Sequence, residues 1–134
     1  MRLAAAIPCH QRLTAPQGSA TRTSALCGSR VSVDVTLDAT GKIIDLGQEV
    51  RACALGQASA ALMAAAAIGR TADDLAEARE ALRLWLGGER GDPGPWPGLD
   101  RLAPAILARA RHGAVLLAFE AAAEAAVAAG NAGR

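Results

Sequence analysis

The fold of this chain is decided by residues 30–63, RVSVDVTLDATGKIIDLGQEVRACALGQASAALM. Apolar and polar residues alternate strictly over residues 30–37, which predicts an antiparallel strand with one buried face. The turn signal DATG follows at residues 38–41, and residues 42–50 read as the returning strand, in which Gly47 is expected to mark a bulge. A run of small, helix-forming residues then begins near Cys53. The stretch therefore predicts a β-hairpin that leads directly into a helix.

Cys53 lies where the returning strand ends and a helix predicted over residues 52–68 begins. The unpaired N–H groups and the positive dipole end of a helix N-terminus stabilise a thiolate. Arg51 would add to this effect if it lies close in space. A thiolate binds soft metal ions or carries sulfur, whereas a free cysteine elsewhere often behaves as a small buried hydrophobe. Both interpretations of Cys53 are open at this point.

Local signals delimit the remaining helices. A capping box at residues 71–74 predicts a helix that ends at Gly87. The following Pro/Gly-rich loop contains Trp96, which either packs the loop down or forms an exposed contact. Residues 99–109 read as helical despite an internal proline, and residues 112–129 read as the last helix.

These elements predict an α+β fold in a single domain. A small antiparallel sheet, made by the hairpin at about residues 30–50 and a third strand near residues 19–26, packs against about four helices. Residues 1–23 are predicted to be an N-terminal arm and residues 24–130 the domain itself. Hydrophobic residues make up 51% of the 134, but aromatic residues only 2%. Such an alanine-rich core often depends on a metal, a partner or self-association as a homo-oligomer.

Charge and cysteine usage restrict the function classes. The formal net charge of +1 is not the basic footprint of a nucleic-acid-binding protein. No charge-free apolar stretch is long enough to span a bilayer, and the first residues lack a leader pattern. Three widely spaced cysteines are an odd number. We therefore expect a cytoplasmic, reducing compartment, where spaced Cys and His residues more often bind metal or do chemistry than form disulfides.

The hairpin also predicts a metal site. Because an antiparallel hairpin returns the chain to its starting end, Cys27 and Cys53 should meet at one edge of the sheet. His112, at the start of the last helix, is a third candidate ligand, although it could equally be a polar helix-end residue. Two thiolates and one imidazole suit Zn²⁺ or an iron–sulfur cluster. Cys9 and His10 on the arm are candidate additional ligands, or a solvated pair with no role.

At these residues the sequence resembles the iron–sulfur cluster assembly scaffolds of the NifU/IscU type, particularly their SufU-like branch. Residues 27–29, CGS, stand where the family has Cys-Gly-Asp. Residues 53–63, CALGQASAALM, are similar to the family helix Cys-Ala-Ile-Ser-Gln-Ala-Ser-Ala-Ser-Met-Met. Residues 69–71, GRT, match its Gly-Lys-Thr-like link. His112 is kept, but Gly113 replaces the third cysteine of the family. The resemblance runs from about Leu26 to the last helix.

The resemblance implies a scaffold or carrier, without enzymatic activity of its own, that transiently binds a [2Fe–2S] cluster or Zn²⁺ through Cys27, Cys53 and His112. It implies a cysteine desulfurase and Fe–S acceptor or carrier proteins as partners. Ser29 lacks the carboxylate that assists ligation in the family, and Gly113 lacks the thiol that usually accepts sulfur.

An arm residue, a second subunit or an exogenous thiol could fill the open fourth position. A metal-free adaptor of the assembly machinery and a persulfide-accepting sulfur-transfer protein are the alternative functions.

Overall fold

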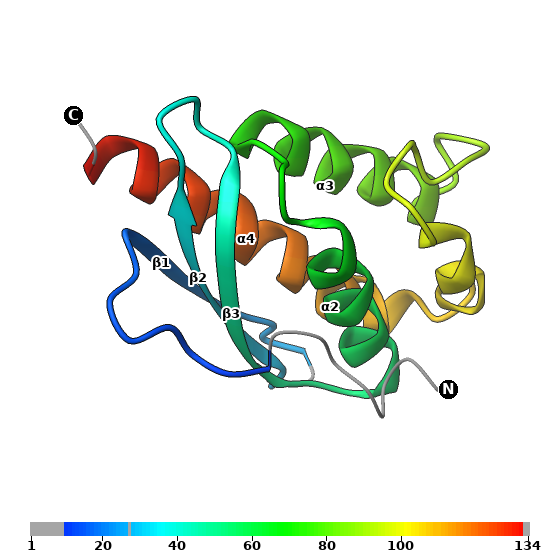
Figure 1. The fold of residues 1–134 in the computed structure, drawn as a ribbon. Helices are drawn as coiled ribbons and strands as arrows, with labels where there is room; N and C mark the ends of the chain where they lie inside the picture. The colour runs from blue at the N-terminus through cyan, green and yellow to red at the C-terminus, as the bar shows by residue number, and fades with distance from the viewer. Residues whose placement is uncertain (1–9, 27, 133–134) are drawn as a thin grey trace.

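Three antiparallel strands form a sheet in the order β1-β2-β3, and the described helices cover one face of it (Figure 1). The structure is a computed structural model that describes residues 10–26 and 28–132. The strands are β1 (Gly18–Thr23), β2 (Arg30–Leu37) and β3 (Ile43–Arg51). The third predicted strand is therefore present, and it lies at the edge of the sheet beside β2.

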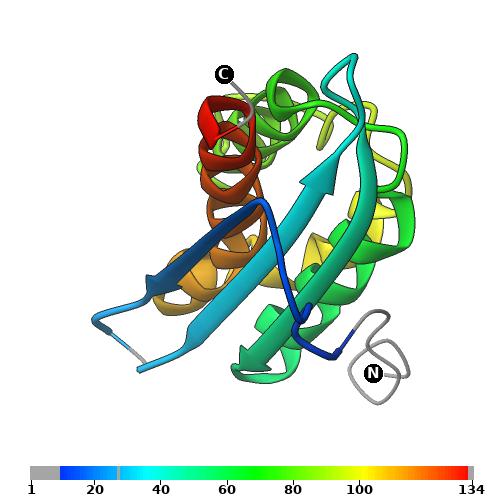
Figure 2. The ribbon, with the colours of Figure 1, turned by 60° about the vertical axis from the view of Figure 1, so that its left-hand side comes forward.

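Helix α4 is the centre of the helical layer. It lies across the sheet and contacts β1, β2, α2 and α3 (Figure 2). The helical elements are α2 (Ala54–Ala66), α3 (Ala72–Leu86), the 3₁₀ turns η1 (Leu99–Ala105) and η2 (Arg109–Arg111), and α4 (His112–Ala132). The predicted α+β class, with an antiparallel sheet and helices on one of its faces, is confirmed.

The core forms between the alternating residues of β2 and the alanine-rich face of α4. Val31, Val33 and Val35 are fully buried on the helix side of the sheet. Phe119 of α4 is also fully buried, and Trp96 from the Pro/Gly loop packs edge-on against it with ring centroids 5.3 Å apart. Trp96 therefore packs the loop down, which settles the choice that the sequence left open.

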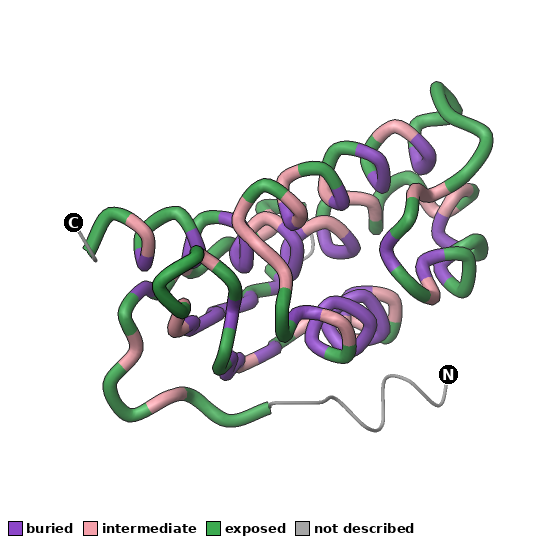
Figure 3. Tube along the Cα trace, turned by 45° about the horizontal axis from the view of Figure 1, so that its top comes forward, coloured by how far each residue is buried: buried purple, intermediate pink, exposed green. Residues whose placement is uncertain are grey.

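The opposite face of the sheet is covered along β2, which the alternation in β2 did not predict, although Ser19, Thr21 and Asp45 remain exposed. Asp34, expected to face solvent, is 0% exposed, and Ser32 beside it is also buried. The cover is residues 10–17, which we call the N-terminal strap. This segment crosses the outer face of β2 and β3 while remaining mostly exposed itself (Figures 2 and 3). The prediction of one solvated face was wrong because a segment distant in sequence supplies the cover.

Two further predictions from the N-terminal half need correction. Residues 1–23 were expected to be an arm, but Gly18–Thr23 form β1 and residues 10–17 form the strap, whereas residues 1–9 lie outside the described part. Gly47 was expected to mark a bulge, yet the register shift lies between Thr36 and Leu37. Gly47 instead makes room for the strap, because a Cβ there would overlap the carbonyl oxygen of Gln11.

The helix boundaries follow their local signals except around Pro104. The predicted capping box is confirmed, since Asp74 N donates to Thr71 Oγ1 at 3.2 Å and Thr71 N donates to an Asp74 oxygen at 3.0 Å. Residues 99–109, predicted to be helical, form the short 3₁₀ turns η1 and η2 instead of an α-helix. Pro104 has no N–H for the i→i−4 bond of an α-helix, and its ring crowds the preceding turn.

Helix α4 has the composition of a membrane span but the burial of a core helix. Taken with the preceding turn as Arg109–Ala132, it is long and apolar enough to cross a membrane by length and composition alone. However, 61% of the apolar 18-residue stretch in this segment is buried within the fold, because α4 packs against the sheet and the other helices. Core helices of soluble proteins commonly pass the same test.

Candidate functional site

The ends of two strands define the region where the sequence predicts a site. Arg30, the first residue of β2, pairs with Arg51, the last residue of β3. Cys53 follows Arg51 by two residues, and Cys27 precedes Arg30 by three. The strand ends thus meet as the hairpin argument required. Cys27 itself lies outside the described residues, so its contact with Cys53 stays a prediction. Its neighbour Leu26 is 82% exposed, in the loop that joins β1 to β2.

Cys53 lies at the N-terminus of α2, as the sequence predicted, but it is the N-cap residue, and the helix spans Ala54–Ala66 and not residues 52–68. Its backbone is extended, with φ −65° and ψ 172°, and its carbonyl accepts from Gln57 N at 2.9 Å to begin the helix. The Gln57 side chain also donates to the Ala52 carbonyl at 2.8 Å, which fixes the chain just before the cysteine. Among the described residues the thiol caps no backbone N–H. Because the residue is only half-buried, the interpretation as a fully buried structural cysteine is wrong.

Gly113, which stands where the resemblance expects a third cysteine, faces the β1–β2 loop. A Cβ at Gly113 would lie 3.2 Å from Ser24 Oγ. That loop is closed by two backbone bonds, from Ser24 N to Ser29 O at 2.8 Å and from Gly28 N to Ser24 O at 2.9 Å. A side chain at position 113 would therefore point at the loop whose sequence includes Cys27.

Small residues bring the start of α2 close to the start of α4. A Cβ at Gly56 would lie 3.3 Å from the Ala114 carbonyl oxygen. One turn further, Ser59 Oγ donates to the Val115 carbonyl at 2.5 Å. The N-terminus of α2, the first turn of α4 and the β1–β2 loop thus gather at one end of the sheet. Residues 53–63 are rich in small side chains, and Gly56 and Ser59 lie where this close approach requires them.

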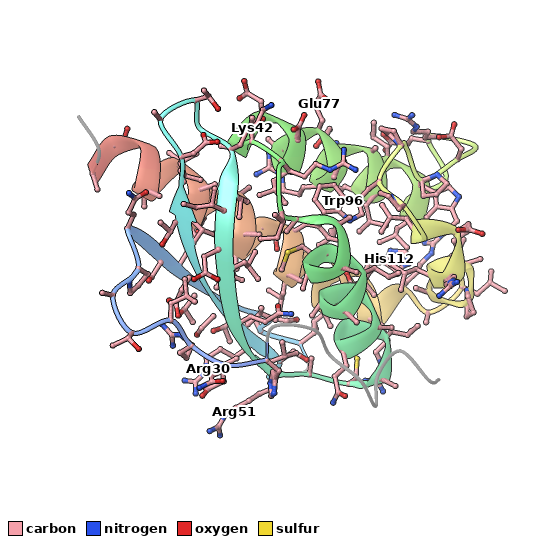
Figure 4. All side chains as sticks on the ribbon, viewed as in Figure 1. Arg30, Lys42, Arg51, Glu77, Trp96 and His112 are labelled. Carbon is pink, nitrogen blue, oxygen red and sulfur yellow. The ribbon has the colours of Figure 1, made fainter. Side chains whose placement is uncertain are left out.

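His112 begins α4, but its side chain is directed toward the end of η1. Its Nε2 is 2.8 Å from the Ala105 carbonyl oxygen and 3.2 Å from that of Ile106. Because carbonyl oxygens accept, Nε2 carries the proton and stabilises the end of η1. This is the polar helix-end role that the sequence left open, and Nδ1 is the ring nitrogen that could hold a metal ion. Figure 4 shows His112 well separated from the strand ends at Arg30 and Arg51.

His10 lies beside β3, which the sequence did not foresee. Val50 N donates to His10 Nε2 at 3.1 Å, so this nitrogen carries a lone pair and the ring is neutral in this contact. Val50 precedes Cys53 by only three residues. The candidate arm ligand is therefore held on the strand that leads to the cysteine, whereas Cys9 lies outside the described residues.

The N-terminal strap is anchored on a buried carboxylate. Asp34 accepts from Arg12 Nε at 2.6 Å and Arg12 Nη2 at 2.9 Å, from Leu13 N at 3.0 Å and from Ser19 Oγ at 2.6 Å. Burial acts to raise the pKa of Asp34, but these hydrogen bonds outweigh it and hold the pKa below its ordinary value. The same pairing raises the pKa of Arg12. A lone Asp in an alternating strand, opposite a Gly, was the sequence signal that could have revealed this anchor.

Two arginines make the cysteine end of the hairpin positive. Arg30 and Arg51 are exposed and lie directly across from each other on neighbouring strands (Figure 4). Like charges in such positions are mildly destabilising. Glu49 offsets them weakly, since its carboxylate lies 3.9 Å from Arg51 Nε. An anionic group bound at this end of the hairpin would lie in a positive field.

The described residues alone contain no group of three or more His, Cys, Asp or Glu side chains placed to hold a metal ion. Cys9 and Cys27 lie outside that search. Of the predicted ligands, the structure therefore describes Cys53, His112 and His10. Each of them lies on a different element.

No family model matches the chain, and no curated protein matches it. Several solved structures do. A nitrogen-fixing NifU-like protein (N-terminal) from Brucella abortus is 36% identical, with 97% of this chain and 90% of that chain covered and a TM-score of 0.86. An iron–sulfur cluster assembly scaffold protein for the SUF system from the thermophile Fervidobacterium islandicum is 21% identical, with 90% and 88% covered and a TM-score of 0.82. A hypothetical protein, 23% identical with 95% and 96% covered, has a TM-score of 0.72. The last two likenesses show the fold alone.

Proposed function

Because this chain belongs to the family of NifU-like N-terminal proteins, we propose that it is a scaffold or carrier for iron–sulfur clusters during their assembly. The observation that carries the proposal is Cys53, a half-buried thiol at the N-terminus of α2. The β1–β2 loop and the first turn of α4 lie at the same end of the sheet. A scaffold protein of the SUF system has the same fold.

The proposed ligands are Cys27, Cys53 and His112, with the cluster or Zn²⁺ as cargo. Thiolate and imidazole are the donors that iron–sulfur clusters and zinc prefer. A metal-bound histidine usually donates its second ring N–H to a carbonyl or carboxylate. His112 has that arrangement, because Nε2–H is directed at the carbonyls of η1 and Nδ1 is left for the metal. The arginines at the strand ends would favour an anionic, thiolate-bound cargo.

Transient binding is the chemistry that a carrier needs. Gly113 and Ser29 remove two groups that the resemblance expects around the cargo, and a smaller ligand set favours release. A cysteine desulfurase would supply sulfur, and Fe–S acceptor proteins would take the finished cluster. We propose no catalytic activity for the chain itself, and a reducing, cytoplasmic compartment would keep its thiols available.

The alternative functions differ from this one in what they require of Cys53. A metal-free adaptor needs the fold and its surface but no thiol. A persulfide acceptor needs a single accessible thiol, and the partial exposure of Cys53 is the observation in its favour. Incubation with a cysteine desulfurase and free cysteine, followed by persulfide detection, would separate these two alternatives.

Anaerobic purification with metal analysis and a visible absorption spectrum tests the proposal. The wild type should contain iron with thiolate-to-iron charge-transfer bands, or stoichiometric zinc, and Cys27→Ser and Cys53→Ser should each lose it. Ile44→Ala, a change at an exposed residue near the opposite end of β3 from Arg51, serves as the control. A folded wild type that stays metal-free and colourless after reconstitution would overturn the proposal.

A further inference from the structure

We propose that His10 is an exchangeable ligand of the same site, held ready by the N-terminal strap. In the structure its Nε2 accepts a hydrogen bond from Val50 N–H at 3.1 Å. On loading, the same lone pair would leave Val50 and bind the metal ion held by Cys53. This inference rests on the proposed function and names the group that fills its open fourth position.

The placement of His10 supports this assignment. Val50 and Cys53 are separated by three residues, so their Cα atoms are at most about 11 Å apart. The Val50 N–H points away from β2, because its acceptor is His10 and not the neighbouring strand. The imidazole therefore lies at the open edge of β3, on the strand that ends just before the cysteine. His10 is exposed, so its ring can turn without opening the core.

The protonation pattern of the ring suits a ligand. A metal ion binds imidazole through a nitrogen that carries a lone pair. The hydrogen bond from Val50 requires Nε2 to be in that form, which leaves the proton on Nδ1. When Nε2 leaves Val50 N–H and binds the metal ion, a coordinate bond replaces one neutral hydrogen bond. This exchange requires no proton transfer. Nδ1–H stays available to donate to an acceptor near the site.

The strap limits where His10 can go. Arg12, two residues further on, is fixed to Asp34 by two hydrogen bonds, and Leu13 N donates to the same carboxylate. The strap backbone rests on Gly47, where any Cβ would displace Gln11. Such a short tether keeps the imidazole at a high effective concentration near Cys53. A free arm of the same composition would sample a much larger volume.

Metal binding by the full-length chain tests the inference through two readouts. Zn²⁺ affinity is measured by competition with a chromophoric chelator, and the d–d and thiolate charge-transfer bands of bound Co²⁺ report the ligand set. His10→Ala should weaken Zn²⁺ binding at least as much as loss of an outer-shell partner, about 10–100-fold. It should also change the Co²⁺ spectrum. Gln11→Ala, one residue away on the strap, should leave both unchanged. Gly47→Val, which displaces the strap, should weaken binding as well.

The outcomes separate this inference from the function on which it rests. If the wild type binds Zn²⁺ through Cys53 but His10→Ala keeps the wild-type affinity and Co²⁺ spectrum, the role of His10 is wrong and the scaffold proposal stands. If the wild type binds neither Zn²⁺ nor an iron–sulfur cluster, or Cys53→Ser binds them equally well, both fail. Nitrogen-15 NMR of the imidazole gives a further check, since loading should shift the His10 Nε2 resonance and leave it unshifted in Cys53→Ser.

Discussion

Replacing Asp34 with Asn should loosen the N-terminal strap and destabilise the fold by about 2 kcal/mol. Asp34 receives four hydrogen bonds, from two Arg12 nitrogens, Leu13 N and Ser19 Oγ. A hydrogen bond to a charged group contributes roughly 1.5–3 kcal/mol. The Arg12 side chain is 46% exposed, so solvent screening reduces its share to about 1 kcal/mol or less. Asn keeps one acceptor oxygen, but its NH₂ group replaces the second one. That NH₂ group would face N–H or O–H groups that need an acceptor.

This loss should be visible in thermal and chemical unfolding. For a chain of this length, a change of about 2 kcal/mol lowers Tm by roughly 6–10 °C. Arg12→Ala should cost less, because Leu13 and Ser19 still satisfy the carboxylate. Combining the two substitutions should cost less than the sum of their separate effects, since both remove the same ion pair. Asp45→Asn, at an exposed position of β3, is the control and should change Tm little.

The effect of Asp34→Asn should depend on pH in one direction. Burial alone would raise the pKa of Asp34, but its hydrogen bonds hold the folded-state pKa below the ordinary value. A carboxyl with a lowered folded-state pKa contributes stability that is fully present above its unfolded pKa, near 3.9. That contribution is lost as the pH falls through the folded-state pKa. The difference between wild type and Asp34→Asn should therefore be constant at neutral pH and shrink below about pH 4.

Amide hydrogen exchange reports on the strap directly. The Leu13 N–H, which donates to Asp34 at 3.0 Å, should be protected in the wild type and exchange much faster in Asp34→Asn. Equal protection of Leu13 in both proteins, together with an unchanged Tm, would refute the view that Asp34 anchors the strap.

The remaining predictions concern the metal site and the Pro/Gly loop. Structural zinc sites bind with about 10–16 kcal/mol through four ligands, so a thiolate restored by Gly113→Cys should contribute roughly 3 kcal/mol, or about 100-fold in Zn²⁺ affinity. Gly113→Ala is the control. Equal chelator-competition curves for the two variants would contradict the expectation that a thiol at position 113 reaches the metal site. Trp96→Phe should lower the free energy of unfolding by about 1–2 kcal/mol, because it removes the 3.0 Å bond from Nε1 to the Leu62 carbonyl. Urea denaturation measures this loss, and an unchanged midpoint would speak against a structural role for that bond.

Local sequence signals predicted the features that depend on residues close together in the chain. The alternation in β2, the turn after it and the N-cap position of Cys53 all depend on neighbours within a few residues. The capping box at Thr71 is of the same kind. These features could be predicted because their hydrogen bonds connect residues close in sequence. Hairpin geometry then predicted that the two strand ends meet, which the pairing of Arg30 with Arg51 confirms.

Features that depend on distant segments were missed. The contact of His10 with Val50 joins residues 40 positions apart, and that of Arg12 with Asp34 joins residues 22 apart. The hydrophobic periodicity of a sequence gives no information about such distant pairs. The sequence therefore predicted a solvated outer face for β2, where the strap in fact covers Asp34. The turns around Pro104 are a different case, because the proline is visible in the sequence and its missing N–H disfavours the α-helix predicted over residues 99–109.

The arrangement of the proposed ligands explains how one site could both hold and release its cargo. Cys53 lies on α2, His112 at the start of α4, and His10 on the strap, so each ligand belongs to a separate element. In a rigid four-ligand site, release would require several bonds to break in one place. In this chain His10 has an alternative partner in Val50 N–H, so its return to the strand compensates part of the lost coordinate bond. We therefore expect strap substitutions to change the rate of cluster release more than the structure of the loaded site. Arg12→Ala should accelerate transfer to an acceptor, measured by stopped-flow absorbance, while leaving the spectrum of the loaded protein unchanged.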